Sequence, residues 1–428
     1  MLPMNVTAMN IETAPHTQTM AAMGAKARAA AAHLARLPTT KRDEALRQAA
    51  CALRQEAPAI LAANAQDMAG FTGTPAFGDR LLLNEARVEA MARGLEEVAA
   101  LPDPLARTLA EWTRPNGLRI SRIPQPLGVL GMIYESRPNV GADAAAIALK
   151  SGNALILRGG SESFHSAQAI HAALSSGFAA ANLPADIVQT APSTDRRFVA
   201  AMLGASGLID LIIPRGGKSL VQLVQREARV PVLAHAEGLN HTYIHSAADF
   251  AMARRVLANA KMRRTGICGA TETLLLDRTI APALLPLLVE DLAALGCTFR
   301  ADASARAICP ALPAATDADF DTEWLDAVLS VKLVEGVDDA LAHIAAHGSE
   351  HTDAIITEDE TVAAHFLGNI ASSVAMWNAS TQFCDGGEFG FGAEIGIATG
   401  RIHARGPIGP EQLTTFRYVV RGTGQVRP

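Results

Sequence analysis

One cysteine of this sequence lies where a catalytic nucleophile would be expected. Cys268 stands between Gly266 and Gly269, after a helical stretch and before an apolar run. Glycines let the backbone turn sharply and let a substrate approach closely. Upstream cations favour the thiolate, the nucleophilic form of cysteine, and three are present at Lys261, Arg263 and Arg264. The local pattern predicts a catalytic thiol and leaves a buried structural thiol open as the alternative.

Two glycine-rich segments follow predicted strands and open predicted helices. Their sequences are LRGGSES (157–163) and IPRGGKS (213–219). Free backbone N–H groups at a helix start, together with a cation, form an anion site. Neither segment matches a dinucleotide fingerprint or a P-loop, and each alone could be an ordinary turn. Two in one sheet predict a phosphorylated ligand such as a dinucleotide, and Arg158 would suit the 2′-phosphate of NADP.

A third segment at a strand end, residues 134–140, carries a cation and an amide. Ligands of α/β sheets bind beyond the carboxyl ends of the strands. Arg137 could hold a carboxylate or a phosphate, and Asn139 could donate to an oxyanion. In the alternative interpretation, Asn139 caps the helix that follows.

Three histidines are spaced as metal ligands on a helix could be, but the sequence does not supply a complete ligand set. His343, His347 and His351 are four residues apart, but Gly348 is expected to end their helix after His347. No carboxylate or thiol completes a ligand set, so we predict no metal site. A second polar cluster, at the start of another predicted strand, consists of His235, Glu237 and His241. It is either part of a site or a satisfied hydrogen-bond network.

The pattern of apolar residues, which predicts the elements that position these side chains, changes at Gly117. Before it, residues 20–70 and 81–100 are alanine-rich and amphipathic, which predicts helices, one with a capping box at Thr40 and Asp43. After it, short apolar runs alternate with helical stretches, which predicts parallel strands covered on both faces. Strands are expected at 119–123, 127–134, 155–157, 187–190, 208–213, 242–244, 273–276, 331–333, 354–356, 373–376 and 417–420.

This alternation of strands and helices predicts an α/β fold with a doubly wound, Rossmann-like nucleotide-binding domain. Residues 1–18 are expected to be a disordered tail. We expect a cofactor domain over 19–237, with a strand near 117–125, and a catalytic α/β domain over 238–395. Residues 396–428 are expected to return to the cofactor domain. The terminal strand has little chain left to cover it, so it could add to a partner's sheet in a homo-oligomer.

Composition excludes several classes of protein. The chain has 428 residues, 49% of them apolar, and a formal net charge of -6 without a basic stripe, which argues against nucleic-acid binding. Its five cysteines lie far apart and favour a reducing compartment, the cytoplasm, over a disulfide framework. No apolar run reaches the length that spans a membrane, and the N-terminus lacks the charged start of a targeting peptide.

Four segments together resemble the aldehyde dehydrogenase superfamily and, within it, the γ-glutamyl phosphate reductases. The resemblance covers nearly the whole chain, from about Met20 to Arg427. It is carried by the blocks 124–163, 260–277, 340–357 and 388–422, with Cys268 at the nucleophile position of the second. The third block, ALAHIAAHGSEHTDAIIT, and the fourth are specific to this reductase.

The resemblance implies reduction of L-glutamyl 5-phosphate to glutamate 5-semialdehyde and phosphate by NADPH, through a thioester on Cys268. This is the second step of proline synthesis from glutamate, and the glutamate kinase that makes the acyl phosphate becomes a candidate partner. The oxyanion hole would comprise the Cys268 N–H and Asn139. Residues expected to bind NADP are Arg158, Gly160, Ser161, Gly216, Gly217 and Ser219. Residues expected to bind substrate are Arg137, Arg215, Lys218 and His241.

The sequence departs from the pattern it resembles at three positions. Gly269 follows the nucleophile where asparagine is usual, Asn240 replaces a usual cysteine, and His245 replaces a usual aspartate. The general base of ordinary aldehyde dehydrogenases would fall on Glu237 or His235. A base is needed to hydrolyse a thioester with water, whereas a reductase acting on an acyl phosphate has no such step.

Overall fold

A computed structural model describes residues 6–135, 137–234 and 237–427. The chain forms two compact units. Unit 1 comprises residues 1–234, 390–396 and 408–428, and unit 2 comprises residues 235–389 and 397–407. The predicted boundary at 237/238 thus lies three residues after the observed one. The predicted return at residue 396 begins earlier, at 390, and is interrupted by a segment that rejoins unit 2.

Unit 1 is built around a four-stranded parallel sheet of order β5-β4-β3-β6. Its strands are β3 (Val129–Tyr134), β4 (Ala154–Arg158), β5 (Val188–Thr190) and β6 (Leu211–Arg215). Its helices are α1 (Val6–Leu34), α2 (Thr39–Gln55), α3 (Ala57–Ala69), α4 (Pro75–Leu81), α5 (Glu85–Ala100), α6 (Val140–Lys150), α7 (Phe164–Ala180), α8 (Arg197–Leu203) and α9 (Lys218–Glu227), with short 3₁₀ turns η1 (Ser161–Ser163), η2 (Ala185–Ile187) and η4 (Glu411–Leu413).

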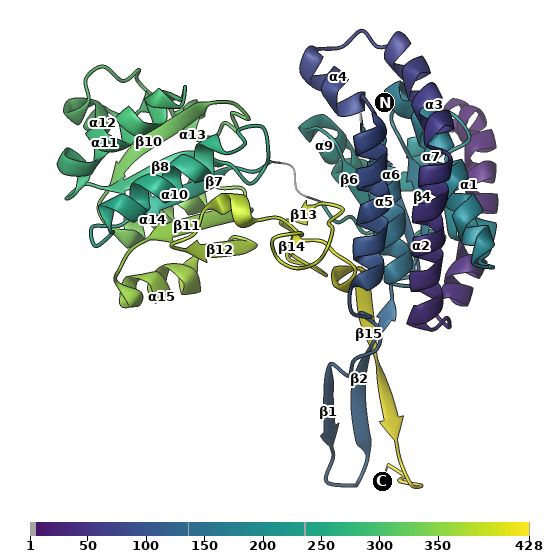
Figure 1. Ribbon diagram of the computed structural model, residues 1–428. Coiled ribbons are helices and arrows are strands. Elements are labelled where there is room, and N and C mark those ends of the chain that lie inside the picture. Colours follow the sequence, from purple (N-terminus) through teal and green to yellow (C-terminus); the bar gives the residue numbers. More distant parts are fainter. Residues whose placement is uncertain (1–5, 136, 235–236, 428) are drawn as a thin grey trace. The chain divides into compact units, whose positions relative to one another are not determined.

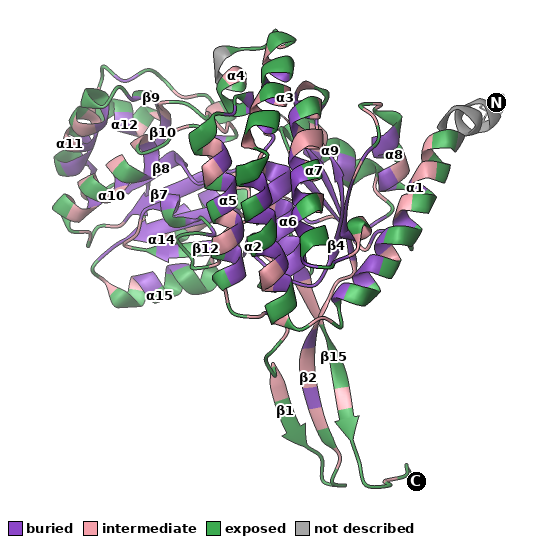
Figure 2. Ribbon diagram, turned by 45° about the vertical axis from the view of Figure 1, so that its right-hand side comes forward, coloured by how far each residue is buried: buried purple, intermediate pink, exposed green. Residues whose placement is uncertain are grey.

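Helices cover this sheet in layers (Figures 1 and 2). Helices α2, α5, α6 and α7 pack against one another, and α1 packs on β3, β4, β5 and α8. The central strands β3 and β4 are buried along their whole length, and β5 and β6 are buried except at their last residues, as expected of parallel strands between helical layers. Helices α2 and α7 approach closely at Gly177, where a Cβ atom would stand 2.3 Å from the Cα of Ala49.

The N-terminal segment differs from the prediction. Residues 6–18 belong to the long helix α1 and are not a disordered tail, and residues 1–5 lie outside the described part of the chain. The helix is anchored by Met20, which is buried, and by His16, whose ring lies 3.1 Å from the Asp195 carboxylate. Helix α2 begins at Thr39 after Pro38 with no side-chain cap, so the predicted capping box at Thr40 is also wrong.

A second sheet of unit 1 has three antiparallel strands in the order β1-β2-β15. They are β1 (Ala110–Thr113), β2 (Arg119–Pro126) and β15 (Thr414–Arg421). The strands predicted near 117–125 and at 417–420 therefore exist and pair with each other. Figure 1 shows this sheet extending beyond the helices of unit 1. Strand β15 is an edge strand and exposes Phe416, Tyr418 and Val420.

Unit 2 contains a six-stranded parallel sheet of order β12-β11-β7-β8-β10-β9. Its strands are β7 (Asn240–Ile244), β8 (Thr271–Asp277), β9 (Thr298–Ala301), β10 (Val328–Val334), β11 (Thr352–Ile356) and β12 (Val374–Trp377), and a small ladder joins β13 (Ile397–Ala398) to β14 (Gly406–Pro407). Its helices are α10 (Phe250–Met262), α11 (Ala281–Ala294), α12 (Ala303–Ile308), α13 (Asp317–Phe320), α14 (Val337–His347) and α15 (Glu360–Asn369), with the 3₁₀ turn η3 (Thr381–Phe383).

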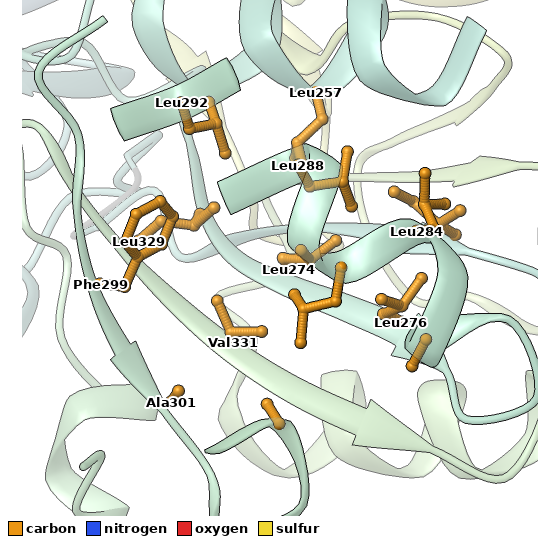
Figure 3. Packing of buried hydrophobic residues seen from close by; sticks show 14 of the residues in the cluster. Leu257, Leu274, Leu276, Leu284, Leu288, Leu292, Phe299, Ala301, Leu329 and Val331 are labelled. Atoms are coloured by element: carbon orange, nitrogen blue, oxygen red, sulfur yellow. The ribbon is translucent and has the colours of Figure 1, made fainter. Parts of the chain in front are cut away.

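Two apolar clusters hold helices against this sheet. One joins Leu257 of α10 and Leu284, Leu288 and Leu292 of α11 to strand residues such as Leu274 (Figure 3). The other joins Ile344 of α14 and Phe366 of α15 to Tyr243, Leu275 and Ile355. These layers fix the strand ends from which the site residues of unit 2 project.

The βα series is confirmed in both units, although the sequence missed the short strands β1, β9, β13 and β14. Those strands have two to four residues each, too short to show a periodicity. No helix among the described residues is long and apolar enough to cross a membrane.

Candidate active site

Cys268 lies in the short loop between α10 and β8 and is half-buried. Its side chain packs against an apolar cluster that includes Met376, Cys384 and Ile397. The loop is held from one side by Gln382, whose amide nitrogen donates to the carbonyls of Ala260 and Arg264, both at 3.0 Å. The thiol is therefore not enclosed in a core, and its backbone is tied to neighbouring elements.

Two residues at and just before the start of β7 also hold this loop. The amide nitrogen of Asn240 donates to the carbonyl oxygen of Cys268 at 2.6 Å and to that of Ala270 at 3.0 Å. Gly238 packs so closely that a Cβ atom there would stand 2.1 Å from the Cys268 carbonyl oxygen. Only glycine fits this approach.

The sequence predicts that three upstream cations favour the Cys268 thiolate, and the structure does not support this for all of them. Lys261 is fully buried, and its Nζ lies 2.5 Å from the Glu272 carboxylate, so its charge is compensated inside the fold. Burial raises the pKa of Glu272 to about 7, and the attraction of Lys261 opposes that rise. Arg263 and Arg264 are exposed and remain candidates for favouring the thiolate.

His241 does not face a ligand site. It is 1% exposed, and both its backbone N–H (2.7 Å) and its Nδ1 (2.9 Å) lie against Asp353 Oδ1. Its ring also packs on His343, with centroids 5.5 Å apart. His241 is therefore part of a buried hydrogen-bond network, which is one of the two alternatives that the sequence allowed. The structure does not support His241 as a substrate ligand. Glu237 is half-buried, and His235 lies outside the described residues.

Two members of the histidine triplet, His343 and His351, are buried in unit 2, and His347 is half-buried. His343 is buried, with ring centroids of His347 at 4.4 Å and Phe320 at 5.3 Å. Burial, reinforced by His241, Lys332 and His347, lowers the pKa of His343 to about 2. Helix α14 ends at His347, as Gly348 predicted.

Unit 1 contains a cavity of about 780 Å³ at the carboxyl ends of its central strands. Apolar side chains such as Val199, Leu203 and Leu220 line part of it. Polar groups line the rest, namely Glu135, Arg158, Ser161, Glu162, Arg196, Ser219, Glu227 and Arg229. An apolar slot with a few converging polar groups is the usual form of a nucleotide pocket in an α/β sheet.

Arg158 is the most buried of the three arginines that line this cavity. It ends β4, is 8% exposed, and donates through Nη2 to the Thr194 carbonyl at 2.9 Å. Its Nε has no hydrogen-bond partner within the described structure. Burial lowers the pKa of Arg158, and Glu162 opposes that shift. Because arginine stays charged in proteins, this group fits an anionic part of a dinucleotide.

The two glycine-rich turns differ. Gly160 and Ser161 line the cavity, as does Ser219. Gly217 donates its N–H to the Glu135 carboxylate at 2.9 Å, and a Cβ at Gly216 would stand 2.3 Å from the same carboxylate. A carboxylate thus occupies the anion position of the second turn, so the prediction that these two glycines bind pyrophosphate is not supported.

Asn139 occupies the N-cap position of α6, but its side chain makes no capping hydrogen bond. Its Nδ2 donates to Asp143 Oδ2 at 2.9 Å. Burial raises the pKa of Asp143 to about 6, opposed by Asn139 and by the nearby Arg215. An amide nitrogen carries two N–H groups, so Asn139 retains a second donor. Arg137 and Arg215 are half-buried and Lys218 is exposed.

Some residues of these sites carried no strong sequence signal. Arg196 belongs to another strand-to-helix connection, after β5, and that position alone could have indicated it. Glu135 directly follows β3, so its position at a strand end could likewise have indicated it. Asn240 and Gln382 are neutral amides whose function depends on the backbone carbonyls they contact, which the sequence does not display.

Comparison with known proteins assigns the chain to a family. The model of the aldehyde dehydrogenase family matches residues 5–310. The γ-glutamyl phosphate reductase of Acidiphilium cryptum is 73% identical over 94% of this chain and 96% of the relative. That of Gluconobacter oxydans is 70% identical over 94% of both chains.

Solved structures give the same assignment. The γ-glutamyl phosphate reductase of Thermotoga maritima has a TM-score of 0.93 at 39% identity, covering 96% of this chain and 100% of that chain. An acetylating aldehyde dehydrogenase from Geobacillus thermoglucosidasius shares the fold, with a TM-score of 0.68 at 18% identity over 97% of this chain and 99% of that one. The chain therefore belongs to the aldehyde dehydrogenase family and, within it, to the γ-glutamyl phosphate reductases.

Proposed function

We propose that the protein reduces L-glutamyl 5-phosphate to L-glutamate 5-semialdehyde and phosphate with NADPH, the second step of proline synthesis from glutamate. Relatives named for this reaction share 73% and 70% of their residues with the chain. The single observation that carries the mechanism is the half-buried Cys268, held in a loop whose backbone is fixed on both sides.

In the proposed reaction, the Cys268 thiolate attacks the acyl carbon and expels phosphate, forming a thioester. The backbone N–H of Cys268 stabilises the oxyanion of this step, and Asn139 stays our candidate, from the resemblance, for a second donor. Bound NADPH supplies the hydride that reduces the thioester. The resulting thiohemiacetal loses its hydroxyl proton and expels the thiolate, which releases the aldehyde. Acyl phosphate, NADPH and a proton thus give aldehyde, phosphate and NADP⁺.

The cavity of unit 1 fits the adenosine end of the cofactor. Its apolar slot would take the adenine ring, and Ser161 and Ser219 offer hydroxyl groups to the ribose or phosphates. Arg158 would bind the 2′-phosphate. Arg137, Arg215 and Lys218 remain our candidates for the substrate's carboxylate and phosphate groups.

Further proposals concern the oligomeric state, the metabolic partner and the compartment of the protein. The edge strand β15, with its exposed Phe416 and Tyr418, would pair with a second copy of the chain. The acyl phosphate is labile, so the glutamate kinase that makes it is the proposed partner. The five cysteines, all among the described residues, form no disulfide, which agrees with the proposed reducing, cytoplasmic compartment.

The decisive assay runs the reaction in reverse. Glutamate semialdehyde is oxidised with NADP⁺ in the presence and absence of inorganic phosphate, and we expect NADPH formation only with phosphate. Turnover that requires coenzyme A in place of phosphate would assign a related thioester-forming dehydrogenase, and no turnover by a folded protein would assign a binding protein.

A pair of cysteine variants tests the nucleophile in the same assay. Cys268→Ala is expected to abolish turnover while NADPH still binds, because the cofactor cavity is lined by other residues. Cys309→Ala removes another half-buried thiol of unit 2 and serves as the matched control. Near-normal turnover by Cys268→Ala would refute the thioester mechanism.

A further inference from the structure

Asn240 makes an unusual set of contacts for a wholly buried amide at the start of a strand. Its Nδ2 bonds two carbonyl oxygens of the nucleophile loop, those of Cys268 at 2.6 Å and Ala270 at 3.0 Å. Its Oδ1 accepts the backbone N–H of Thr352, the first residue of β11, at 3.1 Å. A single amide thereby ties the loop to two strands of the sheet.

The two carbonyls that Asn240 bonds flank one residue, Gly269. Glycine has the least restricted backbone of any residue, so a turn through Gly269 would otherwise sample many orientations. The two hydrogen bonds hold the peptide plane between Cys268 and Gly269 and the one between Ala270 and Thr271, so the turn through Gly269 is held at both of its ends. The first of these planes contains the Cα atom of Cys268, so holding it restricts where the Cα–Cβ bond of Cys268 can project.

Neighbouring residues leave the loop little room to move in other directions. Gly238 packs directly on the Cys268 carbonyl, where a Cβ would stand 2.1 Å from its oxygen. A Cβ at Gly269 would stand 3.3 Å from the Thr381 carbonyl oxygen, so that side of the turn lies against η3. Asn240 supplies the polar contact in this packed arrangement, because it pairs the buried Ala270 carbonyl and the part-buried Cys268 carbonyl.

We propose that Asn240 is a positioning residue for the nucleophile: its amide holds the Cys268 backbone so that the thiol projects in one reactive direction. This proposal rests on Cys268 being the nucleophile. Asn240 touches neither substrate nor cofactor in it, and it acts only through the loop. Asn240 and Gly269 are also two of the three positions at which the sequence departs from the pattern it resembles, and Gly269 stands between the two residues whose carbonyls Asn240 bonds.

The test compares isosteric variants that lose buried hydrogen bonds with and without contact to the loop. Asn240→Leu keeps the side-chain size but loses both donors. Thr242→Val is the matched control, because it removes a buried hydroxyl of the same strand β7, one that pairs with Thr271 of β8 at 2.7 Å without a hydrogen bond to Cys268. Both are expected to lower stability. Asn240→Ser keeps one donor and provides a second, milder variant that still tests the idea if Asn240→Leu does not fold.

We expect Asn240→Leu to lower kcat by about tenfold to a hundredfold, the usual effect of misplacing a reacting group by about 1 Å. The KM for the cofactor should stay within about twofold, and Asn240→Ser should lie between Asn240→Leu and the wild type. Thr242→Val should keep a wild-type kcat in spite of its stability loss. Equal losses of kcat in Asn240→Leu and Thr242→Val, or a normal kcat in Asn240→Leu, would overturn the proposal.

A second readout does not depend on the proposed reaction. The rate at which iodoacetamide alkylates Cys268, followed by peptide mass spectrometry across pH 6–9, should fall in the Asn240 variants while the rate at Cys309 in the same sample stays constant. An unchanged rate at Cys268 would overturn the positioning role even if the protein turns over no semialdehyde. Absent turnover with an altered alkylation rate would instead count against the proposed function alone.

Discussion

The buried histidine His343 makes a pH-dependent contribution to stability that can be worked out from its surroundings. It lies between His241, Phe320 and His347, and its Nε2 has no hydrogen-bond partner within the described structure. Burial and the neighbouring cations lower its pKa to about 2. An unfolded histidine has a pKa of about 6.5. The unfolded chain therefore takes up a proton below pH 6.5 that the folded chain does not.

The sign and size of the effect follow from that difference. Because the pKa of His343 is lower in the folded than in the unfolded chain, its contribution to the free energy of unfolding is fully present above pH 6.5. That contribution is lost progressively as the pH falls below 6.5. Between pH 8 and pH 5.5, protonation of the unfolded state at this one residue costs about 1.4 kcal/mol, and about 2 kcal/mol by pH 5. Replacing His343 with leucine removes the titrating group, so the loss of stability over this pH range should shrink by the same amount.

Urea unfolding of unit 2 measures this loss. Trp324 and Trp377 lie in unit 2 and Trp112 in unit 1, so fluorescence in a Trp112→Phe background reports on unit 2. His343→Leu should reduce the drop in unfolding free energy between pH 8 and pH 5.5 by about 1.4 kcal/mol relative to the parent. The control is His365→Leu, at an exposed histidine that bonds Asp338 at 2.7 Å, and it should not shrink the drop. An unchanged drop in His343→Leu would refute the reasoning.

Three further predictions follow from other contacts. Arg158→Ala should weaken NADPH binding by at least about tenfold more than NADH binding, since it removes the proposed partner of the 2′-phosphate, as titration calorimetry with both cofactors will show. Glu272→Gln should cost about 3–5 kcal/mol of unfolding free energy at pH 8, because the buried Lys261 loses its charged partner. Gly177→Ala should destabilise unit 1 by about 1–3 kcal/mol or more, because its Cβ would overlap the backbone of Ala49.

Each of these has a control that isolates the cause. Equal loss of NADPH and NADH affinity would show that Arg158 does not contact the 2′-phosphate. The double variant Lys261→Met with Glu272→Leu removes both charges and should recover most of the lost stability, whereas no recovery would mean that packing and not charge sets the cost. Gly204→Ala places its Cβ 3.5 Å from the nearest atom and should be mild by comparison with Gly177→Ala.

The corrections share a physical origin. His241, Lys261 and Gly217 each have a side chain or backbone group suited to binding a ligand, and each is matched inside the fold by a carboxylate, those of Asp353, Glu272 and Glu135 respectively. The chemical type of a residue limits what it can bind. Whether a partner within the chain already satisfies it depends on contacts that lie far away in the sequence.

The sequence by itself determined the βα order, the placement of Arg158 at a strand end and of Cys268 in a glycine-flanked loop, because hydrophobic periodicity and glycine turns are local properties of the chain. Only the tertiary structure decided which groups meet. Asn240 reaches the Cys268 carbonyl from 28 residues away, and His241 meets Asp353 from 112 residues away, because the strand order places β7 between β8 and β11. That order is set by packing across the whole sheet, so no local pattern reveals it.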